Sequence, residues 1–302
     1  MAQEGSLWRI RSLPVARQVL RARRETTQAG FTAEWIPKGR LRHHPILISD
    51  CSTSPRLGRT PRQWAVAAAN GLVPLIRFHL ADVRPAIRTR RRRAANDIIS
   101  HLLAEGYTDA DIFVECLTYG TAGMVTTREF ITMAAWDLLD NGALRDRYRA
   151  AERPERLAIL NEVLRLEPMV GHLYRRTTAP FTLTEENQSW AVAAGDLLDV
   201  GVRQANADPD AVGADALSLC PGRRLPPGVN EAGLSFGDGA HRCPGQPLAV
   251  LEADVLLSRL LARDPALVGK PTLGWDDLIA GYSLRGLRVR LGAPATTPRR
   301  HP

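Results

Sequence analysis

The sequence predicts a mainly α-helical protein with a small β component. Leu, Ala and Arg, which favour helices, are abundant, whereas aromatic residues make up 6% of the chain. Several stretches, most of them in the second half, also repeat their apolar residues with the period of a helix. With 302 residues, 44% of them hydrophobic, the chain is long enough for one large core or two small ones.

The elements of the first hundred residues are the least regular. Residues 14–24 predict a helix, Gly30 a turn, and residues 45–49 a short apolar strand or extended piece. Between residues 51 and 93 the composition changes, because Ser, Pro and Arg dominate and apolar periodicity is poor. A helix over residues 63–78 is the element we predict within that segment.

The middle of the chain carries clearer helical signals. Residues 97–105 have the pattern of an amphipathic helix that ends at a glycine. Thr108 and Asp111 then resemble a capping box at the start of an apolar-periodic run, which ends at Asn141-Gly142. At 1.5 Å per residue this run of about 30 residues predicts a central helix roughly 45 Å long.

The second half of the chain alternates between helices and short strands. Residues 152–166 and 247–261 predict helices, and residues 183–202 have the alternation and turn residues of short strands. Residues 209–233 are rich in loop-forming residues, and residues 284–291 predict a terminal hairpin strand.

Charge and hydropathy exclude some classes of protein. The net charge of +8 and pI near 9.9 raise the question of nucleic acid, but the arginines are spread out apart from a cluster at 88–93. There is neither a zinc-finger spacing nor a basic stripe with interleaved aromatics, so we expect a solvated basic surface or an acidic protein partner, and no nucleic acid.

No apolar run approaches the roughly 18 residues of a membrane span, and the N-terminus has no signal-peptide core. We therefore expect no membrane contact and a cytoplasmic location.

Four widely spaced cysteines offer no CxxC pair, which argues against a zinc knuckle or a disulfide framework. The surroundings of Cys243 distinguish it from the other three, Cys51, Cys116 and Cys220. It lies in the cysteine loop, which we define as residues 236–245, just before the helix predicted from Pro247. A buried structural cysteine in a glycine-rich turn is the alternative reading of this position.

A cysteine that ligates iron must be a thiolate held in a rigid, shielded pocket. The positive end of the following helix dipole would favour the anion at Cys243. Phe236 would give the loop an apolar wall. The loop also has glycines whose backbones permit close approaches, namely Gly237, Gly239 and Gly245.

The run FGDGAHRCPGQPLA resembles the haem loop of cytochromes P450, FGxGxHxCxGxxLA, at every fixed position. The resemblance implies a cytochrome P450 fold and a single haem-binding domain over residues 1–302. It also implies haem b (iron protoporphyrin IX), with Cys243 as the iron ligand. His241 and Arg175 match the family's propionate-binding positions, with Arg176 as a substitute for Arg175.

Two further motifs of the family are matched upstream of the cysteine loop. Glu162 and Arg165 match its Glu-x-x-Arg pair, which lies on one face of a helix and locks the loop that carries the thiolate. The segment from Ala122 through Gly123 to Thr126 resembles the oxygen-binding segment. There Gly123 would leave room for dioxygen, and the Thr126 hydroxyl would relay protons. A helix-interior threonine bonded to its own backbone is the alternative for Thr126.

The chain departs from the family pattern in three places. Val125 stands where the family usually has an acid that delivers protons. Cys220-Pro-Gly-Arg-Arg replaces the usual Pro-x-Arg-Phe segment. The family commonly runs to a greater length, and here the region between helix B and the central oxygen-binding helix is compressed into residues 51–93. We therefore expect a P450 fold that is incomplete in this region, as a deletion or an out-of-frame stretch would leave it.

The resemblance implies a haem-thiolate monooxygenase that inserts one oxygen atom of O2 into a small organic substrate. Its electrons would come from an external ferredoxin or flavoprotein. A truncated, non-catalytic or degenerate haem-binding protein is the alternative that the shortened first half favours. A peroxide-using haem-thiolate enzyme is a third, because peroxide chemistry needs less proton relay.

Overall fold

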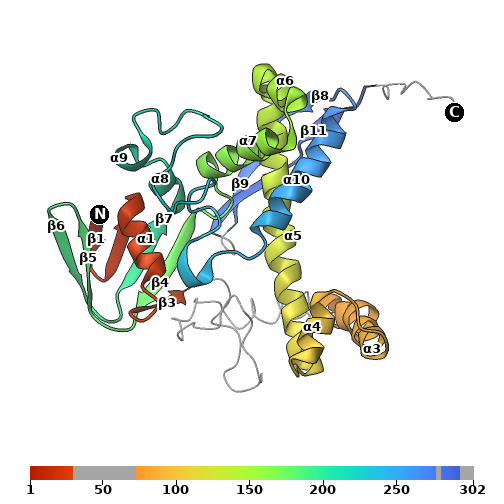
Figure 1. Cartoon of the computed structure of the whole chain (residues 1–302), viewed down its shortest axis with the longest axis horizontal. Coiled ribbons are helices and arrows are strands. Elements are labelled where there is room, and N and C mark those ends of the chain that lie inside the picture. Colours follow the sequence, from red (N-terminus) through yellow and green to blue (C-terminus); the bar gives the residue numbers. More distant parts are fainter. Residues whose placement is uncertain (30–72, 277–279, 293–302) are drawn as a thin grey trace. The chain divides into compact units, whose positions relative to one another are not determined.

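The computed structural model describes residues 1–29, 73–276 and 280–292 (Figure 1). The chain divides into two compact units, residues 1–27 with 123–302, and residues 28–122. This division does not test the single domain predicted over residues 1–302, which stays a prediction. Three sequence predictions fall outside the described residues. They are the turn at Gly30, the extended piece at 45–49, and the part of the helix over 63–78 that precedes residue 73.

From residue 73 onward, the described part of the smaller unit is mainly helical. Residues 73–78 are helical, and the chain continues through a π-helical turn, η3 (His79–Val83), into α3 (Arg84–Arg92). The predicted end of the helix at residue 78 is therefore wrong, because the helical backbone continues through Pro85, which is tolerated in the first turn of α3. α3 packs against α4 (Ile98–Ala104) through a small core, namely Val83, Ile87, Leu102 and Ile112.

The N-termini of α4 and of the central helix are both capped, and the cap of the central helix is the predicted one. Asp97 caps α4 by accepting a hydrogen bond from the Ser100 amide, at 2.9 Å. The Asp111 amide donates to the Thr108 hydroxyl at 3.2 Å, and the Thr108 amide donates back to the Asp111 carboxylate at 3.1 Å. This reciprocal pair is the predicted capping box, and it begins α5 (Asp109–Asp140), the long central helix.

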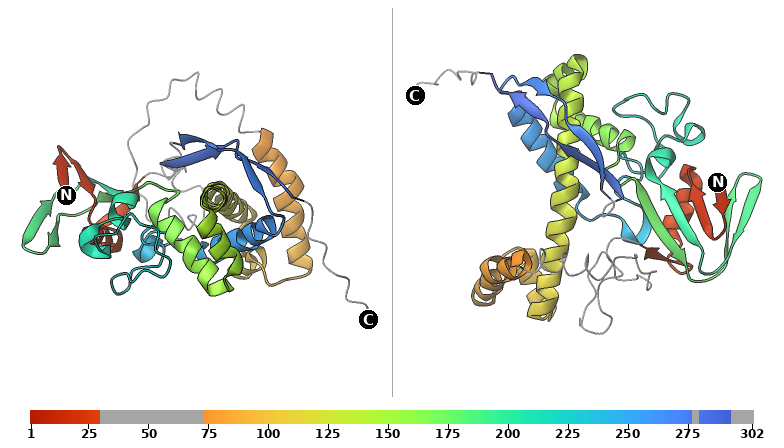
Figure 2. Two further views of the ribbon diagram at one scale, coloured as in Figure 1. Left: turned by 90° about the horizontal axis from the view of Figure 1, so that it is seen from above. Right: turned by 180° about the vertical axis from the view of Figure 1, so that it is seen from behind.

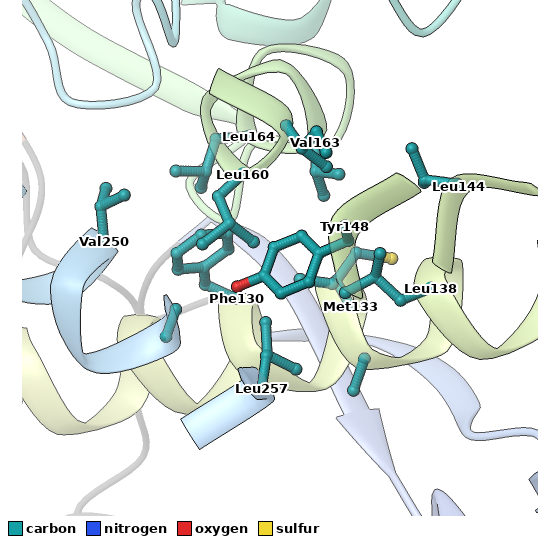
Figure 3. Packing of buried hydrophobic residues seen from close by; sticks show 14 of the residues in the cluster. Phe130, Met133, Leu138, Leu144, Tyr148, Leu160, Val163, Leu164, Val250 and Leu257 are labelled. Carbon is teal, nitrogen blue, oxygen red and sulfur yellow. The ribbon is translucent and has the colours of Figure 1, made fainter. Parts of the chain in front are cut away.

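The larger unit has a helical core built by the second part of α5 with three other helices, α6 (Gly142–Ala150), α7 (Arg153–Leu166) and α10 (Gln246–Leu261). Figure 3 shows how their buried side chains meet, among them Phe130, Tyr148, Leu160 and Leu257. The helices predicted over 152–166 and 247–261 are confirmed. α6 was not predicted from the sequence, because four of its nine residues are charged and Asn141-Gly142 indicated only an end. Asn141 in fact caps α6, by accepting a hydrogen bond from the Leu144 amide.

A buried carboxylate joins three of these helices. Asp254 of α10 accepts a hydrogen bond from the Tyr148 hydroxyl of α6 at 2.8 Å. It also accepts two from the Arg156 guanidinium of α7, at 2.7 and 3.1 Å. Because the Asp254 carboxylate is buried, these hydrogen bonds replace the water that it loses on folding.

The larger unit also contains a five-stranded sheet, in the order β1-β2-β7-β4-β3. Its β2 and β7 run parallel, whereas β1 with β2 and β4 with β7 run antiparallel. The bounds are β1 Ala2–Glu4, β2 Leu7–Ile10, β3 Thr26–Ala29, β4 His172–Thr177 and β7 Leu197–Gly201. The helix predicted over 14–24 is α1 (Leu13–Arg21), whose apolar face is buried in a second core with residues of this sheet. The strands predicted within 183–202 are confirmed, as the hairpin β5 (Phe181–Glu185) and β6 (Gln188–Val192) and as β7.

The C-terminal strands correct one prediction. The single strand predicted over 284–291 is broken at Gly286, whose φ of +79° lies in the left-handed region. β10 (Gly281–Arg285) therefore pairs with β9 (Thr272–Asp276), and β11 (Arg288–Arg290) pairs with β8 (Ala266–Gly269), as the rear view in Figure 2 shows. The predicted loop region 209–233 contains the short α9 (Pro209–Val212), which follows α8 (Val202–Asn206).

No helix within the described ranges combines the length and the apolarity that crossing a membrane requires.

Candidate functional site

The cysteine loop folds back on itself between the second core and α10. Gly237 and Gly239 have φ of +71° and +70°, a conformation that other residues rarely adopt. The Cys243 amide donates a hydrogen bond to the Phe236 carbonyl at 2.8 Å, which closes the loop. A short 3-10 turn, η4 (Gly239–His241), lies within it. The hydrogen bond and the turn fix the backbone on the N-terminal side of the cysteine.

The Cys243 thiol is partly buried near the start of α10, and among the described cysteines it belongs to no disulfide. Gly245 is the N-cap of α10, and a Cβ placed on it would lie 3.7 Å from the Cys243 Sγ, an ordinary contact distance. Cys243 thus lies two residues before the N-cap of α10, a 16-residue helix.

The donor set around this thiol fits haem better than a bare metal ion. Within the described part of the chain, no group of three or more His, Cys, Asp or Glu side chains could hold a metal ion. Haem needs one protein ligand on the thiolate side, because the macrocycle supplies the four equatorial nitrogens. A single thiolate on a rigid glycine-containing loop meets that requirement.

The Glu162 and Arg165 side chains form a buried, bidentate ion pair on α7. The Arg165 Nε and Nη2 atoms donate to the two Glu162 carboxylate oxygens at 2.7 and 2.8 Å, with side-chain exposures of 0% and 3%. Arg165 also donates to the Asn206 carbonyl at 2.8 Å. Removing either member of a pair this deeply buried would destabilise the fold, because the other member would be left as an uncompensated buried charge.

A third charged residue, Arg223, belongs to this cluster and was not among the site residues predicted from the sequence. Its Nε atom donates to Glu162 at 3.2 Å, and its Nη1 atom donates to Asp215 at 2.6 Å. The Cys220 amide also donates to Glu162, at 3.0 Å. The feature of the sequence that could have indicated Arg223 is the arginine pair in Cys220-Pro-Gly-Arg-Arg. This segment departs from the Pro-x-Arg-Phe pattern of the family but still contains an arginine.

Asn206 links the ion pair to the cysteine loop. Its amide nitrogen donates to the Arg165 carbonyl and to the Ser235 hydroxyl, each at 3.0 Å. Its oxygen accepts from the Leu234 amide at 2.7 Å. Leu234 and Ser235 immediately precede Phe236, so α7 is fixed to the residues that lead into the loop.

The three residues predicted to handle oxygen lie on α5. Gly123 and Thr126 belong to the same compact unit as Cys243, whereas Ala122 is the last residue of the other unit. A Cβ built on Gly123 would meet no atom within 4 Å, so the helix surface is open there. Their assembly with Cys243 at one oxygen-binding site stays a prediction.

Glu129, one helical turn beyond Val125, does not replace the missing acid. Its buried carboxylate accepts hydrogen bonds from the Leu284 amide at 2.6 Å and from Arg285 at 2.7 Å, and it also pairs with Arg128. Burial alone would raise the pKa of Glu129, but these hydrogen bonds outweigh burial and hold the pKa below its ordinary value. Glu129 therefore stays ionised and ties α5 to β10.

The predicted propionate partners lie on two different elements. Arg175 is buried on β4, where its Nε atom donates to the Thr26 hydroxyl at 3.2 Å. Arg176, its substitute, points to the other face of the strand and donates to the Gly195 carbonyl at 2.9 Å. His241 is half-buried in η4, two residues before the cysteine. Their roles toward haem stay predictions.

Comparison with known proteins gives this geometry a family. A family model described as Cytochrome P450 matches residues 156–263, which span the ion pair and the cysteine loop. The erythromycin C-12 hydroxylase of Saccharopolyspora erythraea is 34% identical over 217 residues, which cover 70% of this chain and 51% of that protein. The chain belongs to the cytochrome P450 family. The mycinamicin VIII C21 methyl hydroxylase of Micromonospora griseorubida, 28% identical over 200 residues, covers 61% of this chain and 48% of its own length.

Solved P450 structures confirm the fold class. The structure of CYP109E1 from Bacillus megaterium in complex with corticosterone matches with a TM-score of 0.70 at 19% identity, over 95% of this chain and 93% of that one. A mutant of P450 EryK in complex with erythromycin B matches with a TM-score of 0.67 at 20% identity, over 100% and 94%. The P450 chain described here spans about half the length of the curated relatives it matches, and it covers part of the full P450 fold.

Proposed function

We propose that this P450 chain is a haem-thiolate monooxygenase that inserts one oxygen atom of O2 into a small organic substrate. The geometry of the cysteine loop carries the proposal. A thiol is presented before a helix N-terminus, on a backbone closed by the hydrogen bond from Cys243 to Phe236. This geometry, together with the haem-loop motif of the family, supports ligation of the haem iron by Cys243.

The cofactor of this proposal is haem b, which when bound supplies the chemistry of oxygen activation. Cys243 Sγ would ligate the iron, with Phe236, Gly237 and Gly245 shaping the loop against the macrocycle. His241 and Arg175 would bind the propionates. Gly123 and Ala122 would leave room for oxygen, and the Thr126 hydroxyl would hold and pass on a proton. The Glu162–Arg165 pair would keep the loop in place through Asn206.

The proposed partners are an electron donor and a small substrate. A ferredoxin or flavoprotein would deliver the electrons. The relatives named as hydroxylases of erythromycin and of mycinamicin VIII support a compact organic molecule as the substrate. These relatives are about twice as long as the segments that match this chain, so the class of substrate is proposed here and does not follow from the match alone.

The test is incorporation of labelled oxygen. Haem-loaded protein is supplied with a surrogate ferredoxin, its reductase, 18O2 and a panel that includes erythromycin-type macrolides and steroids. Mass spectrometry that finds one 18O atom in a product, absent with Cys243→Ser, supports the monooxygenase. Haem-loaded protein that oxidises the reductant without labelling any substrate in the panel contradicts it.

Two alternatives rest on specific observations. Val125 lacks a carboxylate, and Glu129 is already engaged with Leu284 and Arg285, which favours chemistry with less proton relay. Product formation with hydrogen peroxide, but not with reductase and O2, would show a peroxide-using enzyme. The matched part of the chain covers about half of each of these relatives, which favours a non-catalytic haem-binding protein. Stable haem binding without turnover in either assay would show that function.

A further inference from the structure

The cysteine loop contains a carboxylate, Asp238, at a variable position of the haem-loop motif between the two left-handed glycines. One of its oxygens accepts a hydrogen bond from the Gly239 amide at 2.7 Å, which caps η4. Its other oxygen accepts from two guanidinium groups of α1, at 3.0 Å from Arg17 Nε and 3.0 Å from Arg21 Nε. A further bond runs from Arg21 to Oδ1 at 3.2 Å.

We define Arg17, Arg21 and Asp238 as the arginine clamp. Its geometry and partial burial favour a strong charge-assisted interaction. Arg17 and Arg21 are four residues apart on α1 and so lie on one face of the helix. The side chains of Arg17 and Asp238 are each 16% exposed, whereas Arg21 is 50% exposed. Burial alone would raise the pKa of Asp238, but the hydrogen bonds from the arginines outweigh burial and lower the pKa. The carboxylate therefore stays charged and paired at neutral pH.

The backbone adds a second, steric contact at the same place. A Cβ on Gly239 would lie 2.5 Å from the Leu20 carbonyl, so the end of α1 approaches the loop too closely for a side chain. Arg17 also donates to the Pro227 and Gly228 carbonyls, at 3.2 and 2.8 Å. One arginine thus holds two separate segments of the larger unit against α1. The opposite face of α1 is anchored in the second core.

We infer that α1 positions the cysteine loop through this clamp, which makes Arg17, Arg21 and Asp238 positioning residues for the Cys243 thiolate. Asp238 precedes Cys243 by five residues. The hydrogen bond that closes the loop is donated by the Cys243 amide and accepted by the Phe236 carbonyl, two residues before Asp238. Releasing Asp238 frees the left-handed turn on which that bond depends. The inference deepens the proposed function and rests on it for the role of the thiolate.

The first experiment measures Cys243 protection in haem-free protein, so that it does not depend on haem binding. The rate of alkylation by iodoacetamide is followed by peptide mass spectrometry, with the exposed Cys220 as an internal reference. Asp238→Asn and Arg21→Gln should each raise the Cys243 rate about threefold or more by local opening of the loop, and leave Cys220 unchanged. Asp238→Glu, which keeps the charge, should recover part of the protection. Glu4→Gln, which breaks the exposed pair with Arg9 in the same unit, is the matched control.

A double-mutant cycle separates the clamp from general destabilisation. Once Asp238→Asn is present, adding Arg21→Gln should change the Cys243 rate little, because the partners are already separated. Multiplicative effects of the two substitutions, or unchanged Cys243 rates in both, would overturn the inference.

The second readout is the spectrum of the haem-loaded, reduced protein under carbon monoxide. The clamp variants should shift population from the thiolate-type Soret band to the blue-shifted band of a displaced cysteine, and Asp238→Glu should reverse part of the shift. Wild-type protein that binds no haem would defeat the proposed function, while the alkylation cycle would still decide whether the clamp holds the loop. Normal wild-type haem binding with clamp variants indistinguishable from it would defeat the clamp alone.

Discussion

At the scale of single residues, the charges near the candidate site are held by partners on other elements. The spacing of three between Glu162 and Arg165 predicted their pairing, because residues three apart share a face of a helix. Arg223 reaches Glu162 from 61 positions away, and the two clamp arginines reach Asp238 from more than 200. No spacing rule covers such distances, so these partners could be found only once the chain was folded.

Replacing Arg223 with alanine should destabilise the protein by about 1–3 kcal/mol. The substitution leaves the buried Glu162 with one guanidinium instead of two and removes a bond to the Val212 carbonyl. Arg224→Ala is the matched control, because its neighbouring side chain is exposed, and it should cost about 0.5 kcal/mol or less. Urea unfolding monitored by circular dichroism measures both. Equal midpoints for the two variants would contradict the role given to Arg223.

Asp137 of α5 should make the protein less stable as the pH rises. Burial, with the nearby charges of Glu167 and Asp140, raises the pKa of Asp137 from 3.8 to about 6. Between these values the folded state binds a proton that the unfolded state has lost, so the free energy of unfolding falls as pH increases and levels off above about 6.

Asp137→Asn should therefore stabilise the protein at pH 7.5 by on the order of 1–2 kcal/mol, a discounted figure because the side chain is only half-buried. The gain should vanish below about pH 4, where the carboxyl is protonated in both states. Unfolding free energies measured from pH 4 to 8 test this, with the exposed Asp146→Asn as control. A gain that is constant over this range would show that the effect is not ionisation.

At the scale of elements, the long periodic helices could be predicted and the short or interrupted elements could not. α10 buries residues that recur at helical spacing from Val250 to Leu261, whereas α7 buries every residue from Ile159 to Arg165. α6 has nine residues, four of them charged, and depends on its packing of Tyr148 against α10 rather than on a pattern of its own. The break between β10 and β11 at Gly286 depends on which strands each half pairs with. Residues 284–291 do not reveal those partners.

Two adjacent leucines of α10 should differ sharply in their contribution to stability. Leu257, which lies inside the helical core in Figure 3, is 0% exposed. Leu256 is 47% exposed. Leu257→Ala should cost about 2–5 kcal/mol, because it leaves a cavity among the packed helices. Leu256→Ala should cost about 0.5 kcal/mol or less. Thermal unfolding of both variants measures the difference, and similar losses would mean that α10 packs through another face.

At the scale of the whole molecule, the family assignment and the candidate site come largely from one part of the chain. The family model matches residues 156–263, and the cysteine loop and the ion pair lie within or beside the elements of that segment. The motif predicted the loop because its residues are close in sequence. The predicted compression over 51–93 lies partly outside the described residues, and the chain spans about half the length of its curated relatives. Whether the chain can carry out the proposed function therefore depends on whether the cysteine loop takes up haem.

The most direct measurement is an absorption spectrum of the purified protein with haem added, reduced and exposed to carbon monoxide. Thiolate ligation by Cys243 predicts a red-shifted Soret band that Cys243→Ser abolishes and Cys220→Ser retains. A protein that shows no haem band, or a Cys243→Ser variant with the same red-shifted band, would contradict the assignment of Cys243 as the iron ligand.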